Sequence, residues 1–313
     1  MSIDALVGGV CGEGTHPCPP IPPRDRAGHK GTFGRVLVVG GCARLPRMML
    51  GGPVLAARAA IRAGCGLAEL AIPEPLAAAA LASLESATGH ALPVDAEGNL
   101  LPSACAEVID PVLARSDAAV IGPALGDGFT VEQLVVRFIA HAEVPLVVDA
   151  DALNALARLI DFARDMRGGP VVMTPHPGEY LRLAQALDID GDPIGEGSGA
   201  AAAALAQRCG CVVVLKGART SVSDGVHHWS CHAGTAALAT GGSGDALSGV
   251  IASFAAQFMR SSDRASLFDC ARWGVAAHGL AARLWTVRHG SAGMLTTELC
   301  DLVPDVLGDL RAA

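Results

Sequence analysis

Short apolar runs alternate along this chain with longer Ala-rich stretches. The apolar runs are rich in Val, Ile and Leu at consecutive positions, which is typical of parallel strands buried on both faces. They lie at 35–41, 67–73, 118–122, 145–150, 170–174 and 211–217. The stretches between them are predicted helices, among them 53–64, 74–85, 130–142, 177–187 and 196–208. This alternation predicts an α/β fold with a mostly parallel central sheet and right-handed crossovers.

The pattern changes after residue 217. Residues 219–225 and 226–230 predict a hairpin that turns at Asp224-Gly225, and long helices are predicted at about 243–259 and 264–285. Near the start of the chain, the prolines of PCPPIPPRDR prevent regular helix or sheet. Because no internal repeat or second boundary is visible, we expect a proline-rich arm over 1–27 and a single domain over 28–313.

Composition and charge narrow the class of protein. With 313 residues, 51% of them hydrophobic, the chain can bury one large core. Its formal charge of −8 gives no general attraction to the phosphates of nucleic acid, so we expect small-molecule partners. The ten cysteines are spaced irregularly, which argues against a disulfide framework or a zinc site. The first residues lack a basic stretch and no apolar run is long enough for a membrane span, so we expect a cytoplasmic location.

The run ATGGSGDALSG at 239–249 carries the most specific chemistry. A glycine-rich turn leads directly into an apolar helix, so backbone N–H groups and the positive end of the helix dipole meet at one point. We expect an anion hole there, formed by Gly241, Gly242, Ser243 and Gly244. Asp245 fits a base that takes a proton from a substrate hydroxyl as that hydroxyl attacks a phosphoryl group. The plainer alternative is a first-turn residue that the helix dipole stabilises.

Seven segments, in one order, give the chain a family resemblance over most of residues 28–304. They are HKGTFGRVLVVGG, GGPVLAARAAIRAGCGL, IGPALG, VVDADALNAL, VVMTPHPGEYLRL, VVLKGARTSVSDG and ATGGSGDALSGVIA. Together they resemble the dehydratase half of the NAD(P)H-hydrate repair proteins. The resemblance implies a ribokinase-like, three-layer α/β/α architecture.

The same resemblance implies a reaction. In that family a nucleoside diphosphate donates phosphate to the hydroxyl of a hydrated nicotinamide ring, and loss of the phosphate restores NADH or NADPH. We therefore expect an ADP-dependent lyase acting on hydrated NADH and NADPH (NADHX and NADPHX), with ADP favoured over ATP because bacterial members generally use ADP. Mg²⁺ is expected beside the phosphates with mostly water ligands, so no metal-binding residue is assigned. The family also suggests a homo-oligomer, often a tetramer.

Several residues outside the glycine-rich run acquire roles from the resemblance. Gly52, Ala124 and His176 correspond to substrate contacts, together with Asp245. The adenine nucleotide is expected on Lys216, Gly217, Ala218, Arg219, Thr220 and Gly244. The segment 29–32 is expected beside the substrate cleft.

These residues also have plainer interpretations. His176, between two prolines, is typical of a helix entry, and Lys216 and Arg219 are typical of solvated charges at a strand end. Asp149 and Asp151 follow a buried strand, where we favour capping of the next helix or indirect contact with magnesium. The histidine-rich run HHWSCH at 227–232 matches no zinc spacing and is expected to be a solvated strand.

Three positions depart from the family pattern. Ala124 replaces a usual glycine, Gly234-Thr235-Ala236-Ala237 replaces a usual GNPG run, and Arg283 replaces an acid in the HGLAARL segment. Two rival functions therefore stay open: a ribokinase-like kinase for a hydroxymethylpyrimidine or thiazole alcohol, and a non-catalytic nucleotide-binding protein. The preference between NADHX and NADPHX is also open.

Overall fold

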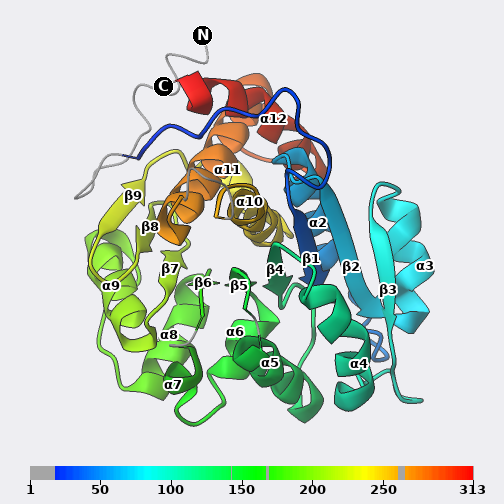
Figure 1. Ribbon diagram of the computed structural model, residues 1–313. Coiled ribbons are helices and arrows are strands. Elements are labelled where there is room, and N and C mark those ends of the chain that lie inside the picture. The colour runs from blue at the N-terminus through cyan, green and yellow to red at the C-terminus, as the bar shows by residue number, and fades with distance from the viewer. Residues whose placement is uncertain (1–17, 142, 167–168, 260–264, 313) are drawn as a thin grey trace.

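A nine-stranded sheet forms the centre of the part of the chain that the structure describes (Figure 1). The computed structural model describes residues 18–141, 143–166, 169–259 and 265–312. The strand order is β3-β2-β1-β4-β5-β6-β7-β8-β9, with parallel pairing up to β7 and antiparallel pairing of β8 and β9. The strands are β1 Arg35–Val39, β2 Leu67–Pro73, β3 Thr88–Leu92, β4 Ala118–Ile121, β5 Leu146–Val148, β6 Val171–Met173, β7 Val212–Leu215, β8 Thr220–Ser223 and β9 His228–Cys231.

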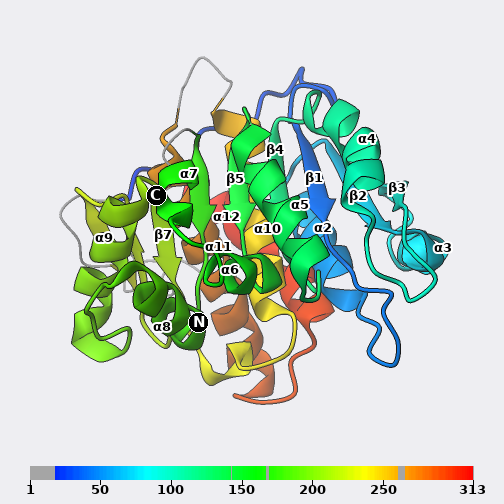
Figure 2. The same ribbon diagram turned by 90° about the horizontal axis from the view of Figure 1, so that it is seen from below.

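Helices cover both faces of this sheet. In Figure 2, α5 to α8 lie in front of the sheet and α10 to α12 lie behind it. The helices are α2 Gly51–Arg62, α3 Glu74–Ser83, α4 Pro102–Leu113, α5 Phe129–His141, α6 Asp151–Leu156, α7 Phe162–Met166, α8 Pro177–Leu187, α9 Ser198–Cys209, α10 Ser243–Phe258, α11 Leu267–His289 and α12 Thr296–Ala312.

The two cores follow from the side-chain alternation of a strand. In β1, Val36 and Val38 pack with α2 and α10, whereas Leu37 and Val39 pack with α4 and α5 on the other face. All four side chains are fully buried. A strand buried on both faces needs apolar residues at consecutive positions, and this is the pattern that the sequence has. The predicted three-layer α/β/α arrangement with a mostly parallel sheet is confirmed.

The six predicted strands and the hairpin are present, but a strand and a helix at one edge of the sheet are among the elements that were missed. The edge strand β3 reads TGHAL and is half exposed, so it lacks the apolar run that identified the others. Helix α4 contains Pro102 and Pro111, which weaken its helical pattern. Both elements lie at the β3 edge of the sheet, away from the centre.

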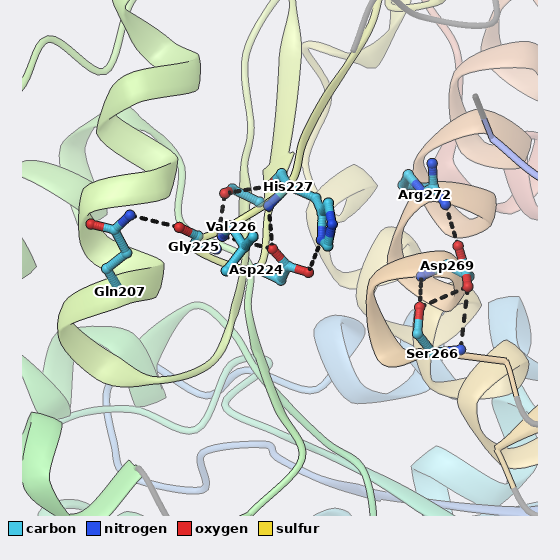
Figure 3. Close-up of polar contacts among 9 residues, drawn as sticks. Gln207, Asp224, Gly225, Val226, His227, Ser266, Asp269 and Arg272 are labelled. Atoms are coloured by element: carbon cyan, nitrogen blue, oxygen red, sulfur yellow. Dashed lines mark hydrogen bonds and ion pairs between the residues drawn. The ribbon is translucent and has the colours of Figure 1, made fainter. Parts of the chain in front are cut away.

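The β8–β9 hairpin turns at Asp224, as predicted (Figure 3). The Asp224 carboxylate accepts hydrogen bonds from the backbone N–H groups of Val226 at 2.9 Å and His227 at 2.6 Å, and contacts His227 Nδ1 at 2.9 Å. Gly225 has φ of +89°, a conformation that favours glycine, and its carbonyl accepts from Gln207 Nε2 on α9 at 2.6 Å. His227 therefore takes part in a turn that holds the hairpin against α9.

The described part of the proline-rich segment, residues 18–27, contacts the last two helices. Ile21 is 1% exposed, and its N–H donates to the carbonyl of Leu310 at 3.0 Å. Trp273 Nε1 donates to the carbonyl of Pro19 at 2.7 Å. Residues 1–17 of the expected arm lie outside the described residues, and the division into an arm and one domain stays a prediction.

Helices α2 and α10 pack backbone against backbone. A Cβ atom added to Gly249 would lie 1.9 Å from the carbonyl oxygen of Ala56, closer than any two such atoms approach. Only glycine allows this approach. The contact holds the first turns of α10 against α2 and thereby fixes the position of Asp245.

We predict that Gly249→Ala lowers the free energy of unfolding by about 2–4 kcal/mol, because the added methyl group forces the two helices apart. The measurement is urea denaturation followed by circular dichroism. The matched control is Gly308→Ala on α12, where an added Cβ meets nothing within 4 Å. That change should stabilise the helix by about 0.5–1 kcal/mol. Equal stabilities of the two variants would show that α2 and α10 are not this closely packed.

Candidate active site

Asp245 is the third residue of α10, directly behind the glycine-rich turn. The helix begins at Ser243, and Gly242 before it has φ of +90°. The N–H groups in the first turn of a helix have no partners within the helix, so this turn presents donors and the positive end of the helix dipole. Gly241 is held in place through its carbonyl, which accepts from Thr296 Oγ1 at 2.7 Å. The predicted anion hole has the backbone arrangement that such a site requires.

Two of the predicted substrate contacts meet at Asp245. A Cβ atom placed on Gly52 would lie 3.2 Å from Asp245 Oδ1 and 3.2 Å from the Cβ of Ala124. The start of α2, the loop after β4 and the start of α10 therefore meet at Asp245. Ala124 has φ of +54°, a region in which glycine is favoured, which explains why an alanine is unusual at this position.

His176 lies at the start of α8. Its Nδ1 accepts hydrogen bonds from the N–H groups of Gly178 at 3.0 Å and Glu179 at 3.3 Å, so the ring caps the helix. The Glu179 carboxylate in return accepts from the His176 N–H at 2.8 Å. His176 is therefore a helix-entry residue, and its contact with the substrate stays a prediction. Because its side chain is about half exposed, with 52% accessible, the ring also faces the solvent side of the site.

Lys216 connects three elements at the carboxyl ends of the strands. Its Nζ donates to Asp149 Oδ1 at 2.7 Å and lies 3.8 Å from Glu179 Oε2. The second oxygen of Asp149 accepts from Ser248 Oγ of α10 at 2.6 Å. Burial opposes the charge on Lys216, but the carboxylates outweigh it and raise the pKa of the ammonium group. Sequence reasoning missed both the Asp149 partner and Ser248, since neither pairing follows from spacing along the chain.

Of the two alternatives for Asp149 and Asp151, capping of the next helix is wrong, and indirect contact with magnesium stays a prediction. Helix α6 has Ala150 at its N-cap and no capping side chain. Asp149 is engaged by Lys216 and Ser248, and Asp151 Oδ2 accepts from the N–H of Gly126 at 2.8 Å, which ties α6 to the loop after β4.

Burial changes the acidity of Asp245. It raises the pKa of this carboxyl group from its usual 3.8 to about 7, the negative charge of Asp149 adds to the effect, and Lys216 opposes it. Burial likewise raises the pKa of Glu179 to about 7, against the opposing charge of Lys216. A carboxyl group with a pKa near neutrality is well matched to proton transfer at physiological pH.

A cavity of about 600 Å³ lies beside the first turn of α10. Five of the six residues predicted to bind the nucleotide line it: Lys216, Gly217, Ala218, Thr220 and Gly244. Arg219 is not among the lining residues. Thr235 and Ala236, two of the positions that depart from the family pattern, are part of the wall, whereas Arg283 is not.

His278 on α11 is a wall residue that sequence reasoning did not single out. Its Nε2 lies 2.9 Å from the carbonyl oxygen of Ser243, and burial lowers its pKa to about 4. The ring is therefore neutral at pH 7, and Nε2 must carry the proton that it donates to this carbonyl. His278 is the first residue of the HGLAARL segment, and this place in a family motif could have identified it. The prediction from that segment concerned only Arg283.

The segment 29–32 is not beside the cleft within this chain, contrary to expectation. It precedes β1, and the carbonyl oxygen of Lys30 lies only 1.7 Å from where a Cβ of Gly66 would be. Gly66 comes directly before β2, so the segment lies at the amino ends of these strands. The substrate cleft is expected at the opposite, carboxyl ends of the strands, where Lys216 and Asp245 lie.

The residues present fit a magnesium ion that arrives with phosphate groups. In the described parts of the chain, no cluster of three or more His, Cys, Asp or Glu side chains is placed to hold a metal. Both oxygens of Asp149 are engaged, and Mg²⁺ commonly keeps several waters and binds few protein carboxylates. Glu179, whose carboxylate lies 3.8 Å from Lys216 Nζ, would accept a hydrogen bond from water on such an ion.

A family model described as NAD(P)H-hydrate dehydratase matches residues 36–305. The chain belongs to the NAD(P)H-hydrate dehydratase family. It is 36% identical over 285 residues to the ADP-dependent (S)-NAD(P)H-hydrate dehydratase of Xanthomonas campestris, covering 90% of this chain and 91% of that protein. It is 37% identical over 298 residues to the bifunctional NAD(P)H-hydrate repair enzyme of Moorella thermoacetica, covering 93% of this chain and 52% of that protein. The chain thus spans about half the length of the bifunctional relatives that it matches.

Solved structures with the same fold support this assignment of the fold. The ADP/ATP-dependent NAD(P)H-hydrate dehydratase of Bacillus subtilis, co-crystallised with ATP and Mg²⁺, matches with a TM-score of 0.71 and 28% identity, covering 93% of this chain and 95% of that one. A ribokinase-like protein from Enterococcus faecalis matches with a TM-score of 0.75 and 22% identity, covering 100% and 96%. The ribokinase-like fold and the family resemblance predicted from the sequence are confirmed. Within the described residues, no helix combines the length and the hydropathy needed to cross a bilayer.

We predict that Asp245→Asn stabilises the protein more at pH 8 than at pH 5. Between about pH 4 and 7 the folded carboxyl group holds a proton that the unfolded one has lost, so its contribution to stability declines as pH rises through this window. Asparagine does not titrate, and the advantage of the variant grows by about 3 kcal/mol between pH 5 and pH 8. Urea denaturation at the two pH values measures it. Asp305→Asn, at an exposed position of α12, is the control. The same stability difference at both pH values would contradict the burial of an ionisable Asp245.

Proposed function

We propose that this protein dehydrates NADHX and NADPHX to NADH and NADPH, with conversion of ADP to AMP and phosphate. The observation that carries the proposal is the position of Asp245. This carboxylate lies beside Gly52 and Ala124 in the first turn of α10, and the cavity of Lys216 and Gly244 adjoins that turn. A base, a phosphate-binding turn and a nucleotide-sized cavity are thus side by side.

The proposed reaction has two steps. In the first, the ring hydroxyl attacks the terminal phosphorus of ADP, the bond from that phosphorus to the bridging oxygen breaks, and the hydroxyl proton moves to Asp245. The turn of α10 and Lys216 face the negative charge that develops on the phosphoryl oxygens. In the second, the phosphate leaves the ring carbon, and a proton leaves the neighbouring carbon. This elimination restores the double bond of the reduced nicotinamide.

A magnesium ion bound with the nucleotide would neutralise charge on its phosphate oxygens. We assign ADP as the donor because the Xanthomonas relative is named as ADP-dependent. The name of the Bacillus subtilis protein includes both ADP and ATP, so ATP is the alternative donor. The homo-oligomer and the cytoplasmic location expected from the sequence stay predictions.

The rival functions receive less support. A vitamin-precursor kinase would use the same α10 turn and base, but the family model and the relatives described above are dehydratases and repair enzymes. A non-catalytic protein would not need to keep the buried pair of Lys216 and Asp149 next to a carboxyl group of raised pKa. Of the three departures from the family pattern, none removes Asp245 or Lys216.

We predict that purified protein restores the reduced-nicotinamide absorbance of NADHX when Mg²⁺ and ADP are supplied. Asp245→Asn should lower kcat by about 10²–10⁴-fold, because it removes the proton acceptor of the transition state. Binding of NADH, measured by its fluorescence, should stay within about threefold, because the amide keeps the shape of the carboxylate. Asp305→Asn serves as the matched control. Equal rates for Asp245→Asn and the unmodified protein would show that Asp245 is not the base of the reaction.

We predict that kcat/KM falls about tenfold for each pH unit below about 7. The base must be ionised, and burial raises the pKa of Asp245 to about 7, so protonation removes activity as pH decreases through that value. Initial rates at low NADHX concentration between pH 5 and 9 measure the profile. A rate that stays constant down to pH 5 would show that no group with such a pKa acts as the base.

A further inference from the structure

The imidazole of His278 is a buried group that the reaction steps above do not use. It belongs to α11, which packs against α10 (Figure 1). Its Nε2 lies 2.9 Å from the carbonyl oxygen of Ser243, the first residue of α10. Both residues line the cavity that is expected to hold the nucleotide. A side chain of α11 thus reaches the start of the helix that carries Asp245.

The Ser243 carbonyl belongs to the same peptide unit as the N–H of Gly244, one of the donors of the predicted anion hole. This peptide is trans, so its N–H and its carbonyl point in opposite directions. A donor that fixes the carbonyl therefore also fixes the direction of the N–H. Gly244 lies beside the cation of the site as well, because a Cβ atom added to it would be 3.2 Å from Lys216 Nζ. The peptide unit thus connects His278 to the place where the phosphoryl group is expected.

The carbonyl of Ser243 does not need the imidazole in order to be satisfied. In an α-helix the carbonyl of one residue accepts from the N–H four residues later, which for Ser243 is that of Leu247. The imidazole is therefore a second donor to an oxygen that has two lone pairs. Hydrogen bonds in a chain polarise one another, so this second donor makes the Gly244 N–H a stronger donor in its turn.

The imidazole acts on this peptide without a charge of its own. Burial lowers the pKa of His278 to about 4, the bond to Ser243 opposes this change, and the positive charge of Lys216 adds to it. A neutral imidazole has a single N–H, and the bond to the carbonyl assigns it to Nε2, which leaves Nδ1 as an acceptor. The peptide is thus polarised without a second cation next to Lys216.

We propose that His278 is a positioning residue of the reaction: its Nε2–H fixes and polarises the Ser243–Gly244 peptide, so that the Gly244 N–H points at the phosphoryl group during its transfer. This inference rests on the proposed function and adds to it a residue that acts through the backbone. The Gly244 N–H matters most in the transition state, where charge develops on the phosphoryl oxygens. Loss of the imidazole should therefore lower kcat more than it raises KM.

The experiment compares three substitutions of His278 in the NADHX assay with Mg²⁺ and ADP. His278→Leu removes both nitrogens, and we expect kcat to fall about tenfold or more with KM for ADP changed less than about threefold. His278→Gln extends an amide NH₂ group to the place of Nε2 but has no acceptor at the place of Nδ1. It should restore kcat to within about threefold of the unmodified protein, because the bond to the carbonyl is kept. His278→Asn is too short for this bond and should resemble His278→Leu.

Two controls and one direct measurement separate positioning from folding. His289→Leu changes an exposed histidine of the same helix and should leave kcat and KM unchanged. Thermal unfolding of each variant reports whether the fold is intact, and His278→Asn takes the place of His278→Leu if the latter does not fold. The direct measurement is the amide proton resonance of Gly244 in protein labelled with ¹⁵N-glycine. A less polarised N–H should move upfield in His278→Leu and return in His278→Gln.

The outcomes distinguish this inference from the proposed function. A kcat within about twofold in folded His278→Leu, or an equal loss in His278→Gln and His278→Leu, would overturn the role of His278 and leave the dehydratase proposal intact. If the unmodified protein turned over NADHX with neither ADP nor ATP, the proposed function would fail. In that case the resonance of Gly244 still decides on the peptide: an upfield shift that glutamine reverses supports its polarisation by His278, and an unchanged resonance overturns it.

Discussion

The buried ion pair of Lys216 and Asp149 is the interaction on which the arrangement of this site depends. Asp149 is 1% exposed, and its two oxygens bind Lys216 from the end of β7 and Ser248 from α10. One carboxylate thus joins β5, β7 and the helix that carries Asp245. Removing one partner would leave a buried charge uncompensated, at a cost of about 3–5 kcal/mol. The pair therefore holds Asp245, the proposed base, in position and places a cation beside the proposed phosphate site.

The electrostatics around Lys216 explain why the site is suited to an anionic nucleotide. Asp149, Glu179 and Asp245 all act on the single ammonium group of Lys216. Their mutual repulsion and their burial keep the pKa values of Glu179 and Asp245 near 7, so these carboxyl groups are not all ionised at neutral pH. Further negative charge from phosphates is tolerable only because the α10 turn adds unpaired N–H groups and a favourable dipole. The same buried charges thus set the raised pKa of Asp245 and the conditions for the proposed binding of phosphate.

Two non-glycine residues at the site have a backbone conformation with positive φ, which is unfavourable for them. Ala124 and Ala150 have φ of +54° and +50°, and each non-glycine residue in such a region costs about 1–2 kcal/mol. Ala150 separates Asp149 from Asp151, so its conformation lets one carboxylate point to Lys216 while the next binds the loop at Gly126. The loop and the strand end are held in this strained form by the contacts of the two carboxylates.

The sequence alone determined most of the sheet and the family. Apolar residues at consecutive positions identified β1, β2 and β4 to β7, because a strand between two helix layers must be apolar on both sides. The glycine-rich turn before Asp245 predicted an anion site, because the geometry of a helix start depends only on local residues. Only the tertiary structure revealed that Lys216 pairs with Asp149 and that Ser248 and His278 support the turn. These contacts join positions far apart in the chain, and their energies depend on burial, which no local pattern records.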